Sequence, residues 1–348
     1  MITEPRQLPN TLRLPANTQT AIDLSSQADA IEAVAYASKA KCGLRCLGEG
    51  SNVVLMPEVQ GLVCYIKDTS IRVLSLDENF VTIAVGAGKN WHELVEETLA
   101  QGWFGLENLA LIPGSVGAAP IQNIGAYGVE VAQFIESVNV IDPDQNVRDI
   151  PASACGFAYR DSVFKARLAA ADNALIILSV TLRLQRRPKV NLSYAELAEA
   201  LEFDAGKGAM AGKPSGQARN APTPTQVAAA VMAIRRNKLP DPYEHPNAGS
   251  FFKNPVTDDK TARRLETLSI KPYPFAEGYK VSAAQLIDSA GWKGTRSGDV
   301  GCWPNQPLVL VNYGQASAQD LLGFAQEIQR SVAERFEIQL ELEPSVVS

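Results

Sequence analysis

The segment LIPGSVGAAPIQNIGAYGVEV, residues 111–131, carries the strongest structural signal in this sequence. Glycine stands at positions 114, 117, 125 and 128, and the alanines at 118 and 119 add almost no bulk. A backbone without side chains lets a flat ring or a diphosphate approach the main chain and its N–H groups. An ordinary loop seldom leaves so many positions clear, so we interpret this segment as one wall of a cofactor site.

A second glycine-containing turn, LGEGSNVVL at 47–55, follows a predicted strand. Its small residues allow backbone N–H groups to point into one concavity, which suits a pyrophosphate. The dinucleotide fingerprint GxGxxG requires a third glycine and then a helix. Here Val53 occupies the third position and an extended stretch follows, so the sequence disfavours that fold. A plain tight turn is the alternative interpretation.

Composition restricts the class of protein. The chain has 348 residues, 46% hydrophobic and 20% charged, which is typical of a globular protein with two or three domains. Its formal net charge of −6 argues against a general affinity for nucleic acid or anionic membranes. We expect no signal peptide and no membrane-spanning helix, because the chain lacks the apolar runs that either requires. Five cysteines without a CxxC pair, and only two histidines, predict a reduced cytoplasmic protein without a metal.

Capping residues and apolar periodicity predict the main elements. Helices are expected to begin after the capping residues Ser26, Asn90, Thr223 and Ser317, with Pro224 as the first helical residue of the third. Strands are expected at 20–24, within 44–55, at 80–88, in a hairpin around Asp142–Pro143, at 175–184, and in the alternating terminal stretch FEIQLELEP (336–344). Residues 204–223 are rich in glycine, alanine and lysine without periodicity, so we expect a flexible surface loop there.

Two polar stretches stand out against this background. In FAYRDSVFK (157–165), Arg160 is either a surface cation or, in a closed pocket, a bidentate clamp for a carboxylate. In NAGSFFKNP (247–255), Ser250 either bonds its own turn or offers a hydroxyl beside two large aromatics. We expect Glu107, Asn108 and His92 to be ordinary surface residues.

Taken together, the chain resembles the UDP-N-acetylenolpyruvoylglucosamine reductase family, and its type I subgroup in particular. The resemblance rests on matching motifs in the family's order, covering nearly the whole chain except 204–223. The motifs are LGEGSNVVL, GAGKNWHELV, GLENLALIPGSVGAAPIQNIGAYGVEV, YRDSVFK, LSYAEL, KLPDP and NAGSFFKNP, followed by the terminal FEIQLELEP.

The resemblance implies an α+β fold: a two-domain FAD-binding fold of the vanillyl-alcohol-oxidase type plus a third, α/β substrate-binding domain. The expected boundaries are 1–68 and 69–239 for the two FAD-binding parts, the second completed by 336–348, with 240–335 as the substrate-binding domain. The implied reaction is the NADPH-dependent, FAD-mediated reduction of UDP-N-acetylglucosamine enolpyruvate to UDP-N-acetylmuramate, in peptidoglycan precursor synthesis. We expect noncovalent FAD, because neither histidine lies in a glycine loop to tether it, and a cytoplasmic monomer with no nucleic-acid or membrane partner.

By the same resemblance, Ser250 is the proton donor, Arg160 holds the substrate carboxylate, and Glu343 is the terminal catalytic carboxylate. Glu341 lies two residues away and is the alternative for that role. Alanines at 118 and 119 replace the serines of some members near the FAD diphosphate. The implied substrate-binding residues are Tyr159, Tyr194, Lys238 and Asn254. The implied FAD-binding residues are Gly48, Gly50, Ser51, Asn52, Pro113, Gly114, Ser115, Gly117, Ala118, Ile124 and Gly125.

Two other functions remain open from the sequence. One is a different oxidoreductase of the same flavin fold that oxidises an alcohol. The other is an inactive sensor of UDP-sugars, which would not require Ser250, Arg160 and a terminal glutamate to be present together. Bound yellow flavin that NADPH bleaches, and its reoxidation by the enolpyruvyl substrate, would separate these three.

Overall fold

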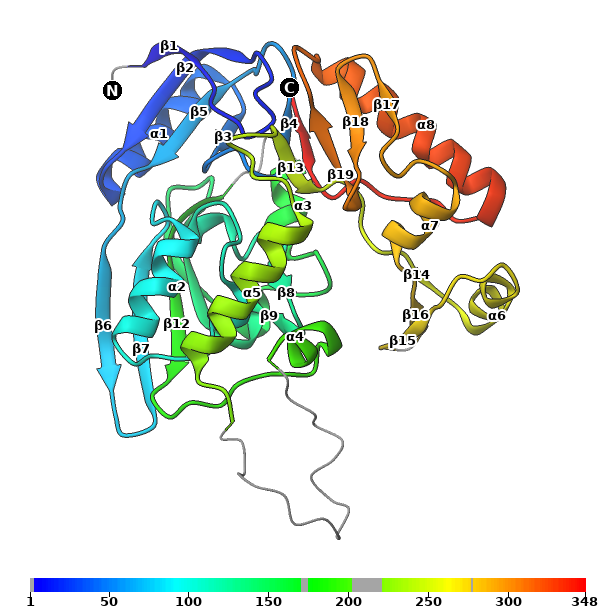
Figure 1. The fold of residues 1–348 in the computed structure, drawn as a ribbon. Coiled ribbons are helices and arrows are strands. Elements are labelled where there is room, and N and C mark those ends of the chain that lie inside the picture. The colour runs from blue at the N-terminus through cyan, green and yellow to red at the C-terminus, as the bar shows by residue number, and fades with distance from the viewer. Residues whose placement is uncertain (1–2, 170–174, 202–220, 277) are drawn as a thin grey trace, which may run out of the picture. The chain divides into compact units, whose positions relative to one another are not determined.

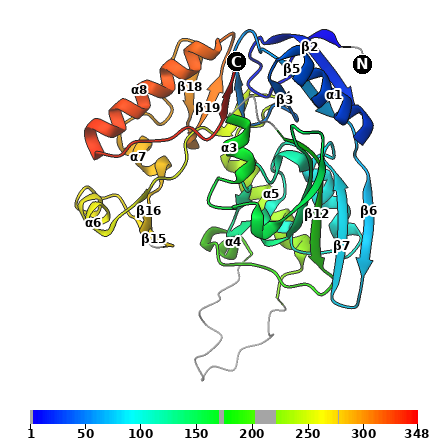
Figure 2. The same ribbon diagram turned by 180° about the vertical axis from the view of Figure 1, so that it is seen from behind.

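The computed structural model describes residues 3–169, 175–201, 221–276 and 278–348, which form mixed helices and strands (Figures 1 and 2). Backbone contacts group the chain into two compact units. Unit 1 comprises Met1–Glu4, Thr20–Gly48 and Gly61–Arg235. Unit 2 comprises Pro5–Gln19, Glu49–Gln60 and Arg236–Ser348. Most of the loop predicted at 204–223 lies outside the described residues.

A small four-stranded sheet, three of whose strands run parallel, lies mostly in unit 1. Helix α1 starts after Ser26, whose side chain and that of Asp29 form the predicted capping box. Its alanines 30, 33 and 37 pack on Leu62 and Cys64 of the sheet. The elements are β2 (Asn17–Leu24), α1 (Gln27–Ala40), β3 (Leu44–Cys46) and β5 (Leu62–Ile66), with β1 (Glu4–Gln7) at the sheet edge in the order β1-β2-β5-β3.

The main sheet of unit 1 is antiparallel. The predicted hairpin around Asp142–Pro143 is confirmed as β10 and β11, and the predicted buried strand as β12. Their alternating side chains place one face of the sheet in the core. The strand order is β11 (Val147–Pro151), β10 (Ile135–Ile141), β12 (Ile176–Gln185), β7 (Phe80–Gly86) and β6 (Ile71–Leu76).

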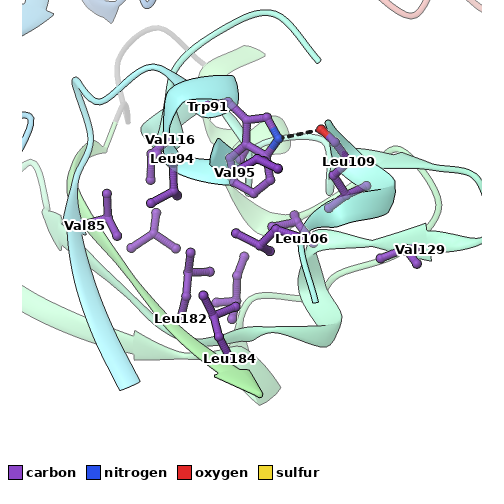
Figure 3. Packing of buried hydrophobic residues seen from close by; sticks show 14 of the residues in the cluster. Val85, Trp91, Leu94, Val95, Leu106, Leu109, Val116, Val129, Leu182 and Leu184 are labelled. Atoms are coloured by element: carbon purple, nitrogen blue, oxygen red, sulfur yellow. Dashed lines mark hydrogen bonds between the residues drawn. The ribbon is translucent and has the colours of Figure 1, made fainter. Parts of the chain in front are cut away.

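Two helices cover that face, α2 (Trp91–Ala100) and α5 (Pro224–Lys238), as Figure 1 shows. Asn90 caps α2 by accepting the Glu93 N–H, as predicted. Figure 3 shows the core between α2 and the sheet, where Trp91 packs among aliphatic side chains and donates from Nε1 to the Leu109 carbonyl at 3.0 Å. This fixes α2 against the segment that leads into residues 111–131.

Short elements complete unit 1. They connect the glycine-rich segment to the sheet and carry several predicted site residues. They are η1 (Glu107–Leu109), η2 (Val116–Ala118), β8 (Gly125–Ala126), β9 (Val129–Glu130), η3 (Val131–Gln133), η4 (Ala152–Ala154), α3 (Val163–Ala169) and α4 (Ala195–Ala200).

Unit 2 is built on a four-stranded antiparallel sheet packed against helices α7 (Ala283–Ser289) and α8 (Ala318–Phe336). Ser317 and Asp320 form a capping box that begins α8, as predicted. Unit 2 also contains a separate three-stranded sheet and helix α6 (Asp259–Thr267). The larger sheet has the order β13 (Asn247–Ser250), β19 (Gln306–Asn312), β18 (Val300–Trp303), β17 (Arg296–Ser297), and the smaller one β14 (Val256–Thr257), β16 (Gly278–Lys280), β15 (Tyr273–Phe275).

The terminal strand differs from the prediction. Phe336 ends α8, Glu337 caps it with a left-handed φ of 52°, and 338–341 follow without regular structure. The strand β20 is Ser345–Val347, which pairs in parallel with β4 (Val53–Leu55). The predicted strand at 336–344 is therefore wrong over 336–341, where the alternating burial comes from packing on unit 2; only Leu342 forms a bridge, antiparallel to Phe252.

Candidate active site

The predicted site residues fall in both units, and each group is described within its own unit. In unit 1 the structure brings together two segments that were predicted to bind the cofactor. A Cβ on Gly48 would lie 2.7 Å from Ser115 Oγ. Only glycine permits this approach without displacing the hydroxyl, so the turn after β3 and the segment 111–131 lie in close contact.

Packing between backbone segments explains part of the glycine content. A Cβ on Gly117 would lie 2.6 Å from the Cβ of Ala87, and one on Gly125 would lie 3.3 Å from Arg160 Nη1. Gly114 has a φ of 117°, a conformation that other residues rarely adopt. The interpretation of the segment as cleared for a ligand is thus incomplete, since Gly117 is required by its protein neighbour.

His92 supports the beginning of this segment. Leu111 has a left-handed φ of 59°, and its N–H donates to Nδ1 of His92 at 3.1 Å. The His92 side chain is 23% exposed. The expectation of an ordinary surface histidine is therefore wrong, because the imidazole satisfies a backbone donor that the strained turn leaves without a helical partner.

One further feature of the segment fits a bound cofactor. Oε1 of Gln122 is buried and has no hydrogen-bond partner among the described residues. A buried acceptor without a partner is costly, so such an atom favours a ligand that donates to it. Together with the surface formed by Gly48 and Ser115, this atom makes the residues present compatible with a dinucleotide cofactor.

Arg160 is bound to the glycine-rich segment. Its Nη2 donates to the Gly125 carbonyl at 2.8 Å. The residue has a φ of 54° and sits in a tight turn closed by the pair Ala158 and Asp161. Its guanidinium carbon lies 5.3 Å from the ring centroid of Tyr159. The geometry holds the guanidinium near Gly125, as a residue that binds an anionic ligand there would require.

Tyr194 lies at the first turn of α4 and is 43% exposed. Its ring meets that of Tyr127 edge-to-face, with centroids 5.2 Å apart. Burial raises the pKa of Tyr127 to about 12, so its hydroxyl stays protonated at neutral pH. Asn108 donates to the carbonyls of Tyr127 and Asn191, each at 2.9 Å, and so ties this tyrosine pair to the start of the segment.

The prediction of surface positions for Glu107 and Asn108 is wrong, since each is 1% exposed. Glu107 Oε2 accepts the Gly105 N–H at 2.6 Å. Burial raises the pKa of the Glu107 carboxyl, and the Gly105 N–H opposes that shift. The motif GLENLALIPG offered the only signal, a polar pair inside an otherwise apolar run.

In unit 2, Ser250 ends strand β13 and is half-buried. Gly249 before it has a φ of 68°, and the register of β13 against β19 shifts between Asn247 and Ser250. Asn247 is 3% exposed and its Oδ1 accepts the Gly249 N–H at 2.9 Å. The bulge therefore has a defined shape that sets the direction of the serine.

The two phenylalanines after Ser250 anchor the strand. Phe251 and Phe252 are 0% and 1% exposed, with ring centroids 5.8 Å apart in the core of unit 2. Phe251 donates its N–H to Leu308 O at 2.7 Å. Structural anchoring thus accounts for the aromatics, and they rigidly support the neighbouring hydroxyl.

The chain after α8 pairs with this same strand. Glu343 N–H donates to Phe251 O at 3.0 Å, and Lys253 N–H donates to Glu341 O at 2.9 Å. The Glu341 side chain is 73% exposed and forms an ion pair with Lys253 at 3.0 Å. Glu343 is half-buried, and its backbone bonds to Phe251, the residue that follows Ser250. The Glu341 carboxylate is therefore already paired with Lys253, a residue that the sequence analysis had not indicated.

The remaining predicted residues of unit 2 have structural contacts of their own. Asn254 Oδ1 accepts the Ala283 N–H at the start of α7, at 2.9 Å. Gly50 has a φ of 67°, and a Cβ there would lie 2.6 Å from Pro9 O. Asn52 O accepts the Ser345 N–H at 3.2 Å. Ser51 lies between Gly50 and Asn52 in the sequence. Lys238 is the last residue of α5. No group of His, Cys, Asp and Glu suited to a metal ion occurs among the described residues.

Among the described residues, no helix is long and apolar enough to cross a membrane. Comparison with known proteins adds family information. A model described as "FAD binding domain" matches residues 19–150. Another, described as "UDP-N-acetylenolpyruvoylglucosamine reductase, C-terminal domain", matches residues 241–347.

Full-length similarity extends these matches. The UDP-N-acetylenolpyruvoylglucosamine reductase of Pseudomonas fluorescens (strain Pf0-1) is 42% identical over 340 residues, 97% of this chain and 95% of that one. The protein of the same name from Polynucleobacter asymbioticus is 39% identical over 97% of this chain and 94% of that one. The crystal structure of UDP-N-acetylenolpyruvylglucosamine reductase (MurB) from Thermus caldophilus superposes with a TM-score of 0.68 at 25% identity, covering 100% of both chains.

Proposed function

Because this chain belongs to the UDP-N-acetylenolpyruvoylglucosamine reductase family, we propose that Arg160, Ser250 and Glu343 carry out the family's reduction. The enzyme reduces UDP-N-acetylglucosamine enolpyruvate to UDP-N-acetylmuramate with NADPH, through FAD, in peptidoglycan precursor synthesis. The predicted family, α+β fold class and FAD cofactor are thereby confirmed. The observation that supports the proposed roles is the backbone bond from Glu343 to Phe251, which joins Glu343 to the residue that follows Ser250.

FAD supplies the hydride chemistry, taking electrons from NADPH and passing them to the enolpyruvyl group. We propose that this cofactor binds noncovalently to residues of both units. Those of unit 1 are Gly48, Pro113, Gly114, Ser115, Gly117, Ala118, Ile124 and Gly125, and those of unit 2 are Gly50, Ser51 and Asn52. The unpaired Oε1 of Gln122 supports this assignment. Acid precipitation of the yellow protein should release the chromophore into solution; colour retained in the pellet would contradict noncovalent binding.

Charge and proton delivery fall to the protein. Hydride addition to the terminal carbon of the enol ether places negative charge on the adjacent carboxylate. Arg160 holds that carboxylate, and a preorganised guanidinium stabilises the developing charge. Ser250 gives its hydroxyl proton to the carbon that bears the carboxylate, as a general acid. A neutral donor places no additional charge in the site.

Glu343 is favoured over Glu341 for the terminal carboxylate by two observations. The Glu341 carboxylate forms an ion pair with Lys253, and its side chain is largely exposed. Glu343 is half-buried beside the serine strand. We assign Tyr159, Tyr194, Lys238 and Asn254 to the substrate, and the pairing of Tyr194 with Tyr127 supports a fixed ring at that position.

The experiment that tests these roles separates the two halves of the reaction. In Ser250→Ala, NADPH should still bleach the flavin at the wild-type rate, because that step uses no proton from Ser250. Reoxidation by the enolpyruvyl substrate should slow by at least about 10²-fold, the lower range for losing a general acid. Stopped-flow absorbance of the flavin measures both steps. A wild-type reoxidation rate would show that Ser250 only shapes its turn.

The same assay distinguishes the alternatives. An inactive UDP-sugar sensor would show no reoxidation by the substrate at all, and an alcohol oxidase would be reduced by its alcohol. We also propose a cytoplasmic, monomeric enzyme with domains at 1–68, 69–239 completed by 336–348, and 240–335. The five free cysteines support the reducing compartment. Sedimentation and limited proteolysis test the monomer and the boundaries.

A further inference from the structure

We propose that Asn123, which no sequence motif had indicated, positions Arg160 for the substrate carboxylate. The proposal rests on the role of Arg160 given above and names the residue through which the fold sets that role. Asn123 lies within the glycine-rich segment, is 1% exposed, and has a left-handed φ of 44°. Asparagine is among the few residues with a side chain that tolerate this conformation.

The Asn123 amide makes three hydrogen bonds within unit 1. Its Nδ2 donates to Ala158 O at 3.1 Å and to Glu130 Oε2 at 2.9 Å. Its Oδ1 accepts the Ala132 N–H at 3.0 Å. Both amide hydrogens and the carbonyl oxygen are thus used, and none of the three bonds is to solvent.

The bond to Ala158 sets the position of Arg160. Ala158 and Asp161 exchange backbone hydrogen bonds at 3.1 and 3.2 Å, and Arg160 lies in the turn that they close. The turn and the residue after it are joined to the glycine-rich segment by three bonds: Asn123 to Ala158 O, Arg160 Nη2 to Gly125 O at 2.8 Å, and Ser162 Oγ to Ile121 O at 2.5 Å. Asn123 therefore fixes the backbone of the turn, and Gly125 fixes the guanidinium.

The remaining bonds fix Asn123 itself. Gly125 pairs with Glu130 between β8 and β9, so the carboxylate that receives the Asn123 amide lies on the strand opposite Gly125. An aspartate at 123 would lose both donors and would face the Glu130 carboxylate. It would keep the shape of the side chain while removing the Asn123 bond that holds Ala158 in the turn.

The test compares the two half-reactions of the FAD-loaded enzyme. In Asn123→Asp, flavin reduction by NADPH should stay within about threefold of wild type. Reoxidation by the enolpyruvyl substrate should slow by about 10- to 100-fold, the cost of misplacing a catalytic group by about 1 Å. The matched control is Asn139→Asp, where the lost amide also donates to a carboxylate, Asp149, at 2.9 Å on the sheet. That control should leave both steps unchanged.

A double-mutant cycle with Arg160→Lys gives a readout that a purely structural role would not move. If Asn123 acts through the guanidinium, Asn123→Asp should have little further effect on reoxidation once Arg160 is lysine. If the fold-reductions in reoxidation rate of the two single variants multiply in the double variant, the two residues act independently and the proposal is overturned. Equal slowing of both half-reactions by Asn123→Asp would also overturn it, since that pattern indicates a general distortion.

The cycle also separates this proposal from the one on which it rests. A wild-type reoxidation rate in Arg160→Lys would remove the role of Arg160 itself. Slow reoxidation in Arg160→Lys with a normal rate in Asn123→Asp would remove only the role of Asn123. Should Asn123→Asp not fold, Asn123→Ser provides the milder change, because its shorter side chain does not reach Ala158. Selective slowing of reoxidation supports the proposal there too, and two normal half-reactions contradict it.

Discussion

Replacing Gly117 by alanine tests whether packing, rather than the cofactor, requires glycine in the central segment. The new Cβ would lie 2.6 Å from Ala87 Cβ, 3.1 Å from Ala87 O and 3.2 Å from Ala87 Cα. Carbon atoms prefer about 3.5–4.0 Å, so the two segments must separate by about 1 Å. Ala87 and Gly117 are also joined by a backbone hydrogen bond of 2.9 Å, which resists that movement.

Overpacking of this kind costs about 1–3 kcal/mol of unfolding free energy. For a domain of this size the melting temperature should fall by about 2–12 °C. Thermal unfolding followed by circular dichroism, with and without added FAD, measures the change. Ala87→Gly in the same chain should recover part of the loss, because it removes the closest contact and leaves the other two.

The control is Gly323→Ala on helix α8, where a Cβ meets nothing within 4 Å. That change should stabilise the protein slightly, by about 0.5–1 kcal/mol, because alanine favours the helix. The decisive result comes from flavin-free protein. A Gly117→Ala deficit that disappears without FAD would refute the packing argument, since a ligand stabilises only through its own binding.

Three further predictions follow from the described contacts. Glu343→Gln should slow substrate-driven flavin reoxidation by at least about 10²-fold, whereas Glu341→Gln should change it by less than about threefold, because the exposed Glu341 side chain only forms an ion pair with Lys253. The opposite order would move the role to Glu341, and two mild effects would exclude both. Ending the chain at Pro344 should lower the melting temperature and FAD retention, because β20 and the buried Val347 support β4 directly after the turn at 47–52; an unchanged melt would show the tail to be dispensable. Burial raises the pKa of Glu107 in the folded protein. The neutral carboxyl therefore contributes stability that is complete below the unfolded pKa and is lost as the pH rises through the folded pKa. The melting temperature of Glu107→Gln should rise relative to wild type between pH 4 and pH 8, and a difference that does not change with pH would contradict this.

Local features could be predicted from the sequence because their partners are close in the chain. The capping oxygens of Ser26, Asn90 and Ser317 each accept an N–H three residues later, so a short window contains both atoms. The hairpin around Asp142–Pro143 is similar, since its strands are joined by their own turn. The family motifs also occur in order along the chain, which is why fold class, cofactor and reaction followed from the sequence.

The remaining features depend on residues far apart in sequence. The apolar alternation of 336–342 resembles a strand, yet Phe336 continues the buried stripe of α8, and the ladder forms at 345–347 only because β4 lies there. The apolar run around Glu107 and Asn108 gives only a weak signal of their burial, which for Asn108 depends on distant carbonyls such as Asn191 O. Likewise the packing of Ala87 requires glycine at position 117, and Asn123 donates to Ala158 in the turn that contains Arg160. Steric fit and hydrogen-bond satisfaction are properties of such pairs, and a linear sequence does not contain the distance between their members.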